Sequence, residues 1–283
     1  MVERRHETAV VDGHRIHFLT AGDPADPPLV LLHGGIIDAA GVSWGAVVEP
    51  LAREYRVVAP DLLGYGRSAK PDVTYSLSTH VDVVAAFVET VGLDDPAVAG
   101  ISMGGGAALG VALRAPERVD RLVLLDSYGL GRELANGHLT RLLAKQGLTN
   151  KLAIALMRRS RGFTEASLGN IVHDTDDLSA DAVDAVWEEV KRPGVGKAFR
   201  SFRAAEVGPD GYRTDFSDRL GGLGVPTLLL HGEHDEVFPH RWSERAAARI
   251  PEGEFRLLDD CAHWAPRERP GAVVDLISGF VSP

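Results

Sequence analysis

Cysteine is nearly absent from this chain, whose 283 residues include only Cys261. One thiol can form neither an intrachain disulfide nor a cysteine-based metal site, so nothing argues for an oxidising compartment and we expect a cytoplasmic protein. Long apolar runs are missing as well. No stretch approaches the roughly 18 consecutive apolar residues that a membrane helix requires, so we do not expect a membrane partner.

The chain also lacks an excess of positive charge. It carries 30 Lys and Arg residues against 40 Asp and Glu residues, and no run of basic residues is longer than two. Nucleic-acid backbones are bound by clustered basic side chains, so nucleic acid is not an expected partner. The composition, 45% hydrophobic and 25% charged, is that of an ordinary globular protein, which excludes disorder and collagen-like structure.

Short apolar runs bounded by Gly, Pro or Asp recur along the chain, as is typical of strands buried on both faces. They cover residues 28–33, 56–60, 97–100, 121–126, 226–231 and 254–258. Helical patterns at 78–91 and 103–114 alternate with them, which predicts a parallel sheet with helical crossovers. Near the start, Asp12-Gly13 predicts a hairpin between two antiparallel strands.

The strand pattern stops between residues 131 and 222, where apolar residues recur at helical spacing. Leu139, Leu142 and Leu143 form one such group, residues 152–156 form another, and Ser179 is a candidate N-cap of a further helix. Because strands resume afterwards, we interpret 131–222 as a helical lid inserted into an α/β core of residues 1–130 and 223–283.

A nucleophile motif lies where the third of these apolar runs ends. Residues 100–104 read G-x-S-x-G, between a buried strand and an apolar helix, which is the context this motif requires. A serine on so tight a turn has strained backbone angles, and side chains at the flanking positions would collide, so glycines there leave Ser102 exposed. A capping serine at a glycine-rich helix start is the competing interpretation. Gly104, Gly106 and Gly110 do not have the spacing of a dinucleotide-binding motif.

A serine nucleophile needs a base and an acid that orients the base, and with this turn the order along the chain is serine, acid, histidine. Asp235 directly follows one predicted strand and His263 follows the next. Both lie at carboxyl ends of strands, where open α/β sheets build their sites. We therefore predict a triad of Ser102, Asp235 and His263, with Glu233 and Asp126 as competing acids.

The oxyanion donors are predicted from two turns. The segment His33-Gly34-Gly35 follows a buried strand, and Met103 begins the helix after the serine. Backbone N–H groups at such turns can face a developing negative charge, so we assign Gly35 and Met103, with Ile36 as the alternative to Gly35. A glycine turn without a catalytic task stays the competing interpretation.

Four segments together resemble the α/β-hydrolase fold family over residues 7–130 and 223–281. They are His33–Gly35, the Asp61–Ser68 loop that reads DLLGYGRS, the Ser102 turn and Cys261–Trp264. The resemblance implies a mostly parallel, eight-stranded sheet flanked by helices, with an inserted helical lid. Ser102 stands where the dehalogenase and epoxide hydrolase branches carry Asp, which argues against those two chemistries.

Within that family the chain is most similar to meta-cleavage product hydrolases, which break carbon–carbon bonds in ring-fission products. The similar segments are Met103-Gly-Gly, 118–124, Gly129-Leu-Gly131 and the tryptophan after His263. Two polar groups of that subfamily are absent. Ile101 replaces an Asn before the nucleophile, and Val186 replaces an Arg before Trp187. Without these donors, we expect the pocket to favour neutral acyl or aryl groups.

We therefore predict a serine hydrolase that cleaves carboxylic esters through an acyl-enzyme, with no cofactor and no metal. Carbon–carbon hydrolysis of meta-cleavage products is the alternative, and a ligand-binding receptor of the same fold is the alternative from another class. The expected partner is a small ester or related acyl compound, and a homodimer stays open. We expect four residues to contact the substrate: Ile36, Ile101, Trp187 and Trp264, with the lid residues Leu142 and Leu156 as further apolar candidates.

Overall fold

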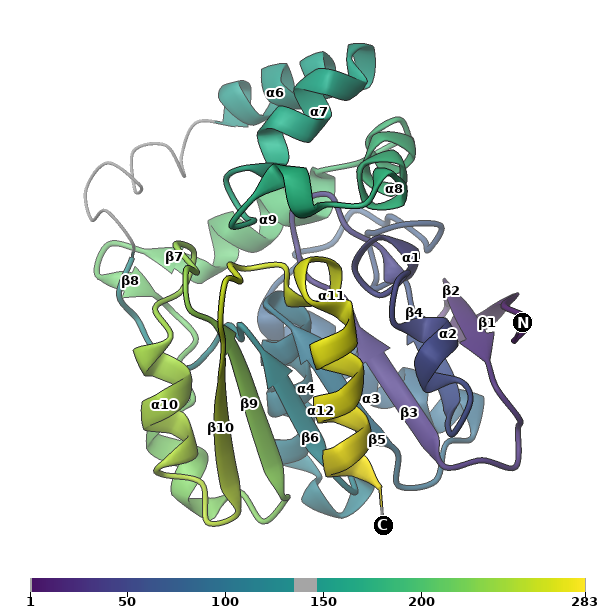
Figure 1. Cartoon of the computed structure of the whole chain (residues 1–283), viewed down its shortest axis with the longest axis vertical. Coiled ribbons are helices and arrows are strands. Elements are labelled where there is room, and N and C mark those ends of the chain that lie inside the picture. The colour runs from purple at the N-terminus through teal and green to yellow at the C-terminus, as the bar shows by residue number, and fades with distance from the viewer. Residues whose placement is uncertain (1, 135–146, 283) are drawn as a thin grey trace.

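A computed structural model describes residues 2–134 and 147–282 and is built around one eight-stranded sheet. Its strands are β1 (Arg5–Val11), β2 (His14–Ala21), β3 (Pro28–Leu32), β4 (Arg56–Pro60), β5 (Ala97–Ile101), β6 (Leu122–Leu125), β9 (Thr227–Gly232) and β10 (Gly253–Leu258). Their order in the sheet is β1-β2-β4-β3-β5-β6-β9-β10 (Figure 1). The expected fold is confirmed.

The first two strands form the hairpin predicted at Asp12-Gly13, with Val11 opposite His14. Strand β2 also pairs antiparallel with β4, whereas every later pairing in this sheet is parallel. Parallel strands all end at the same edge, so the loops after β3, β5, β6, β9 and β10 meet there.

Alternate residues of the central strands pack into two separate hydrophobic layers, which is why these strands read as continuous apolar runs. Val30 and Leu32 contact the layer formed with α3 (Leu77–Val91), α4 (Met103–Arg114) and α10 (Arg241–Ala247). Leu29 and Leu31 contact the opposite layer, which includes residues of α1 (Ala40–Ser43), α2 (Val48–Leu51), α11 (Ala265–Glu268) and α12 (Pro270–Val281). The sheet is therefore covered on both faces.

Among the described residues between β6 and β9, four α-helices lie at the edge where the parallel strands end (Figure 1). They are α6 (Gly147–Arg159), α7 (Arg161–Leu168), α8 (Ala180–Val190) and α9 (Lys197–Glu206). The Ser179 hydroxyl accepts a hydrogen bond from the Ala182 N–H at 3.2 Å, so Ser179 caps α8 as expected. Leu139, Leu142 and Leu143 lie outside the described residues.

A short two-stranded ladder in this segment was not predicted. Strands β7 (Val207–Gly208) and β8 (Gly211–Tyr212) pair antiparallel directly after α9. Strands of this length contain no hydrophobic periodicity, so no sequence pattern indicates them. Within residues 2–134 and 147–282, no helix has the length and apolar character needed to cross a bilayer.

Candidate active site

Ser102 lies on a tight turn between β5 and α4, with backbone angles φ 53° and ψ −120°. A positive φ is rare for a residue with a side chain and stores strain. The flanking glycines make the turn sterically feasible: a Cβ at Gly100 would overlap the Gly104 carbonyl, and a Cβ at Gly104 would overlap the carbonyls of Leu32 and His33. The local geometry is that of a nucleophile turn.

The structure brings Ser102, His263 and Asp235 into one hydrogen-bonded chain. His263 Nε2 lies 3.0 Å from Ser102 Oγ, and His263 Nδ1 lies 2.8 Å from Asp235 Oδ2. A proton on Nδ1 donated to the carboxylate leaves Nε2 free to accept the serine proton, which is the arrangement required of a general base.

Asp235 is held in place and kept ionised by its surroundings. Its Oδ1 accepts hydrogen bonds from the N–H groups of Val237 (2.7 Å) and Phe238 (3.2 Å). Burial raises the pKa of this carboxyl, but the charge of His263 and hydrogen bonds from His231 and His263 outweigh it and leave the pKa well below its usual value. The negative charge that would stabilise a protonated His263 is therefore in place.

The two competing acids do not make the bond to His263. Asp126 is fully buried and its Oδ1 accepts the Gly232 N–H at 2.8 Å, while its Oδ2 has no partner among the described residues. Glu233 is exposed, and its Oε2 lies 3.6 Å from Nε2 of His234. Of the three candidates, only Asp235 contacts the imidazole.

Hydrogen bonds fix the turn after β3 so that one side of it faces Ser102. Asp38 Oδ2 accepts hydrogen bonds from the Gly34 N–H (2.8 Å) and the Ser43 hydroxyl (2.7 Å). His33 Nε2 accepts the Leu62 N–H at 2.9 Å, so the histidine before the glycines anchors the turn to the Asp61–Ser68 loop. From the sequence, His33 was interpreted as a turn histidine, which agrees with this bond, whereas Asp38 was given no role.

Gly35 and Met103, the predicted oxyanion donors, both line the cavity at Ser102. Met103 is the first residue of α4, so its N–H has no acceptor within the helix. Neither this N–H nor that of Gly35 donates a hydrogen bond to another atom of the described chain. Ile36 also lines the cavity and has a positive φ of 64°, unusual for a β-branched residue.

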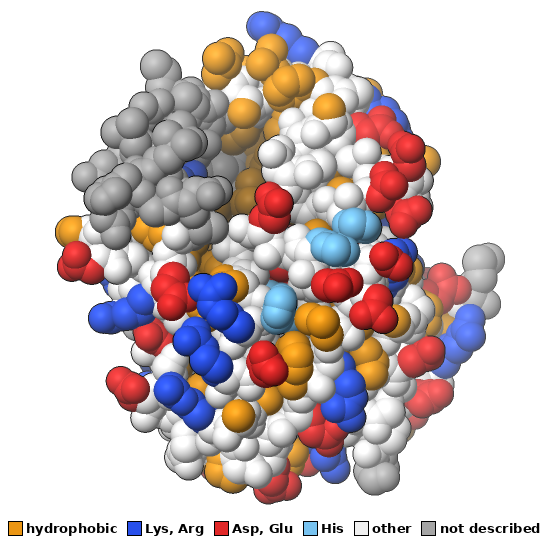
Figure 2. Space-filling view, turned by 60° about the vertical axis from the view of Figure 1, so that its left-hand side comes forward, with side chains coloured by type: hydrophobic (Ala, Val, Ile, Leu, Met, Phe, Trp, Pro, Cys, Tyr) orange, Lys and Arg blue, Asp and Glu red, His pale blue; other side chains and the backbone are white. Residues whose placement is uncertain are grey.

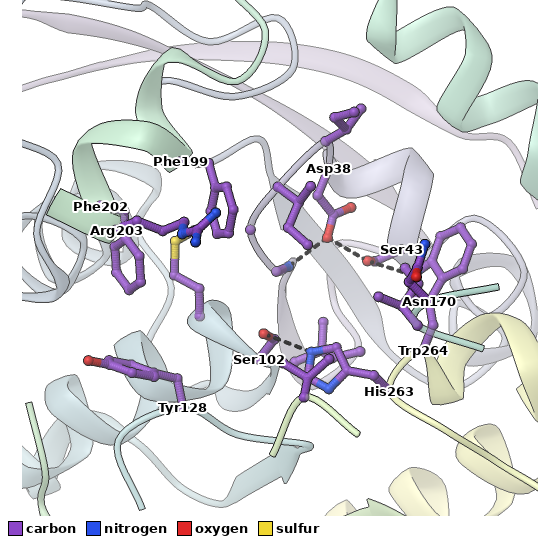
Figure 3. A pocket seen from close by; sticks show the side chains of 18 of the residues that line it. Asp38, Ser43, Ser102, Tyr128, Asn170, Phe199, Phe202, Arg203, His263 and Trp264 are labelled. Carbon is purple, nitrogen blue, oxygen red and sulfur yellow. Dashed lines mark hydrogen bonds between the residues drawn. The ribbon is translucent and has the colours of Figure 1, made fainter. Parts of the chain in front are cut away.

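The cavity above Ser102 has a volume of about 420 Å³ and a mostly apolar lining (Figure 3). Three of the four predicted substrate-contacting residues line it: Ile36, Ile101 and Trp264. Helices α7, α8 and α9 contribute Leu168, Val186 and Phe199, respectively. The cavity is thus enclosed jointly by the sheet edge and the helices after β6.

Trp187 does not line this cavity, contrary to expectation. Its neighbour Val186 does, because successive residues on a helix point in different directions. The Trp187 ring instead packs beside the apolar layer on one face of the sheet, and Lys191 Nζ lies 3.2 Å from the ring centroid. Leu156 is 39% exposed and also lies away from the cavity, and Leu142 is outside the described residues.

The cavity also contains a cation that was not predicted. Arg203 of α9 lines it, with Cζ 5.7 Å from the centroid of the Phe199 ring. Burial lowers the pKa of its guanidinium, which nevertheless stays charged at neutral pH. The expectation of a pocket for neutral acyl or aryl groups was based on Ile101 and Val186 alone and did not take Arg203 into account.

Within residues 2–134 and 147–282, one further group of side chains outside the triad has atoms close enough to be compared with a metal site. His173, His234 and Asp260 are exposed and offer ligand atoms within 4.8 Å of one another. Figure 2 shows histidine side chains next to acidic ones on the surface. The rings of His173 and His234 are stacked at 15°, so their in-plane lone pairs do not converge on one ion.

The geometry of the turn, the triad and the sheet defines the class of protein, and the sequence comparison agrees. The chain belongs to the alpha/beta hydrolase fold family, whose model matches residues 27–270. The fold and the family are those of hydrolytic enzymes.

The chain is also similar to individual proteins of known sequence or structure. A 2-hydroxymuconate semialdehyde hydrolase of Pseudomonas putida is 30% identical, over 90% of this chain and 87% of that protein. The crystal structure of 2-hydroxy-6-oxo-6-phenylhexa-2,4-dienoate hydrolase from Rhodococcus sp. strain RHA1 superposes with a TM-score of 0.82 at 25% identity, covering 99% of each chain. Naproxen esterase of Bacillus subtilis shares the fold alone, with a TM-score of 0.79 at 22% identity over 99% of this chain and 92% of that one.

Proposed function

We propose that the protein hydrolyses carboxylic esters through an acyl-enzyme formed on Ser102. The observation that carries the proposal is the hydrogen-bonded chain from Ser102 through His263 to Asp235, which opens into a largely apolar cavity. Such a chain supplies a nucleophile, its base and the orienting acid together.

In the proposed first step, Ser102 Oγ attacks the ester carbonyl carbon while His263 Nε2 takes the hydroxyl proton. The carbonyl oxygen becomes an oxyanion that accepts hydrogen bonds from the N–H groups of Gly35 and Met103. The carbon–oxygen bond to the alcohol then breaks, and the alcohol leaves with the proton from His263. Asp235 stabilises the transient imidazolium.

Deacylation repeats these steps with water as the nucleophile. His263 takes a proton from water as the water oxygen attacks the acyl carbon, and a second oxyanion forms at the same donors. The bond to Ser102 Oγ breaks, the serine recovers its proton from His263, and the carboxylic acid leaves. Apart from the ester and water, every group in this cycle is a residue of this chain, and the cycle calls for no cofactor.

The test is turnover of 4-nitrophenyl acetate by the wild-type protein and by Ser102→Ala. We expect the variant to lose activity by several orders of magnitude while keeping its circular dichroism spectrum and melting temperature. Activity within tenfold of wild type would refute the role of Ser102. Absence of turnover in both proteins, with tight binding of a small ester, would favour the receptor alternative.

Carbon–carbon hydrolysis of ring-fission dienoates is the second candidate. Two observations favour it: the names of the relatives at 25–30% identity, which are those of carbon–carbon hydrolases, and the Arg203 guanidinium in the cavity. Against it, Ile101 directly before the nucleophile offers no polar side chain to a dienoate. We therefore keep ester hydrolysis as the main proposal.

A further inference from the structure

Arg203 is the one guanidinium that lines the cavity within the described residues, and it has no ion-pair partner there. Its side chain lies beside Phe199 and Phe202, across the cavity from Asn170 and Trp264, with Ser102 between the two sides (Figure 3). No hydrogen bond from Arg203 to another described atom is found, and residues 135–146 contain no Asp or Glu that could supply a carboxylate.

The nearest carboxyl group on the same helix is already engaged elsewhere. Glu206 Oε1 accepts the Leu77 N–H at 2.8 Å. Its Oε2 accepts the hydroxyl protons of Tyr128 (3.0 Å) and Thr214 (2.6 Å). Glu206 thus fastens α9 to the core while leaving Arg203, one turn earlier, without a counter-ion.

Arg203 is half-buried, so part of the water that would otherwise solvate its charge is removed, and this loss is costly in a mostly apolar cavity. The face of the Phe199 ring recovers part of this cost by a cation–π contact. The five N–H donors of the guanidinium remain, and they match the two oxygens of a carboxylate in a planar, bidentate fashion. A phosphate dianion would leave one negative charge uncompensated beside a single guanidinium.

We propose that the cavity binds esters carrying a carboxylate at a distance from the scissile bond, and that Arg203 pairs with this carboxylate while Ser102 attacks the ester carbonyl. The inference rests on the proposed ester hydrolysis and names its substrate class. Arg203 acts here as a specificity-determining residue, because it binds a remote part of the substrate and takes no part in bond breaking.

The experiment compares matched esters that differ only in the remote charge. For a carboxylate on the acyl side, the pair is mono-4-nitrophenyl adipate and 4-nitrophenyl hexanoate, which have the same number of acyl carbons. For a carboxylate on the alcohol side, the pair is 4-acetoxybenzoate and 4-methylphenyl acetate. We expect wild-type kcat/KM to favour the charged member of at least one pair, and the favoured pair identifies the side.

Substitution of Arg203 tests whether the preference depends on its charge. In Arg203→Gln, kcat/KM for the charged ester should fall about 10- to 100-fold, chiefly through KM, while that for the neutral ester changes less than about threefold. Arg203→Lys keeps the charge and should retain part of the preference. Arg200→Gln is the matched control, since Arg200 lies on the same helix and does not line the cavity.

A binding measurement separates this inference from the proposed reaction. Calorimetric titration of Ser102→Ala with adipate or 4-hydroxybenzoate should show binding that the added Arg203→Gln substitution removes. Equal losses on charged and neutral esters in Arg203→Gln, without such binding, would overturn the inference and leave ester hydrolysis standing. Retained turnover in Ser102→Ala together with Arg203-dependent binding would instead refute the proposed reaction and keep the carboxylate site.

Discussion

The carboxyl groups of Asp126 and Asp235 lie side by side at the ends of neighbouring strands, and only that of Asp235 is bonded to His263. Oxygens of both carboxyls and a nitrogen of His263 fall within 4.8 Å of one another. Burial, followed by the charge of Asp235, raises the pKa of Asp126 well above its usual value. Burial and the neighbouring charge thus favour the neutral form of Asp126, whereas Asp235 stays ionised.

Replacing either acid by its amide should show which of the two carboxyl groups supports His263 in catalysis. Asp235→Asn removes the charge that stabilises the imidazolium and presents the wrong tautomer, so we expect kcat to fall by about 10⁴-fold. Asp126→Asn keeps the shape and an oxygen acceptor for the Gly232 N–H, and Asp126 makes no hydrogen bond to His263, so kcat should change less than about threefold. Steady-state assays of 4-nitrophenyl acetate provide the comparison, and a larger loss in Asp126→Asn would show that the acid is misassigned.

The second prediction concerns the choice between ester and carbon–carbon bonds. We expect a higher kcat/KM on phenyl acetate than on any ring-fission dienoate, because Ile101 offers no hydrogen bond to the enol oxygen. One missing charge-assisted bond costs about 1.5 to 3 kcal/mol, enough to slow turnover by about one to two orders of magnitude. Parallel assays decide the question, and faster cleavage of 2-hydroxymuconate semialdehyde than of phenyl acetate would reverse the order of the two candidates.

Stability should respond sharply to a methyl group at the nucleophile turn. Gly104→Ala would push a Cβ into two backbone carbonyls that cannot rotate away, so we expect the free energy of unfolding to fall by about 1 to 3 kcal/mol or more. Gly279 of α12 has open space around its Cβ position, and Gly279→Ala should raise stability by about 0.5 to 1 kcal/mol. Urea titrations of both variants measure the contrast, and equal effects would argue against the close contact at Gly104.

The fourth prediction uses His80, which is buried among aromatic rings with neither nitrogen hydrogen-bonded within the described part of the chain. Burial lowers its pKa to about 3, from an ordinary value of 6.5. Below pH 6.5, His80 therefore binds a proton in the unfolded chain but stays neutral in the folded chain. As the pH drops from 6.5 towards 3, the free energy of unfolding falls by about 1.4 kcal/mol per pH unit.

In His80→Phe, the free energy of unfolding should fall less steeply between pH 6.5 and 3. At pH 7 it should be unchanged or higher, because an unsatisfied polar ring is replaced by an apolar one. Denaturant titrations at pH 4, 5, 6 and 7 supply the measurement. Parallel pH profiles for the two proteins would mean that His80 does not contribute to the acid sensitivity.

The parts of the site that sequence reasoning reached are those determined by neighbours along the chain. The Ser102 turn needs only the strand, glycines and helix beside it, all visible within a few residues. Choosing between Asp126 and Asp235 was harder, since β6 and β9 are adjacent in the sheet but far apart in the sequence. Both acids follow buried strands, so pattern alone could not separate them.

The lid residues were predicted least well because their roles depend on how each helix is rotated against the sheet. Trp187 and Val186 are neighbours in the sequence, yet only Val186 contacts the cavity. Arg203 lies in an amphipathic pattern that is equally typical of a solvated face, and no local signal indicates that its guanidinium points inward. Such orientations arise from long-range packing, which a single sequence does not display.

The bonding of Glu206 has a consequence for making chimaeras within this family. One buried carboxyl group joins three separate stretches: the start of α3 at Leu77, the loop after β6 at Tyr128, and Thr214 beyond the β7–β8 ladder. A graft that moves residues 131–222 into another core therefore transfers Glu206 and its donor Thr214 but leaves the other two donors, Leu77 and Tyr128, behind. The recipient must supply an equivalent of Tyr128 and a free N–H at the start of its own α3, or the graft buries an acid without donors. We therefore expect a chimaera to fold when the loop after β6, which contains Tyr128, is transferred together with residues 131–222.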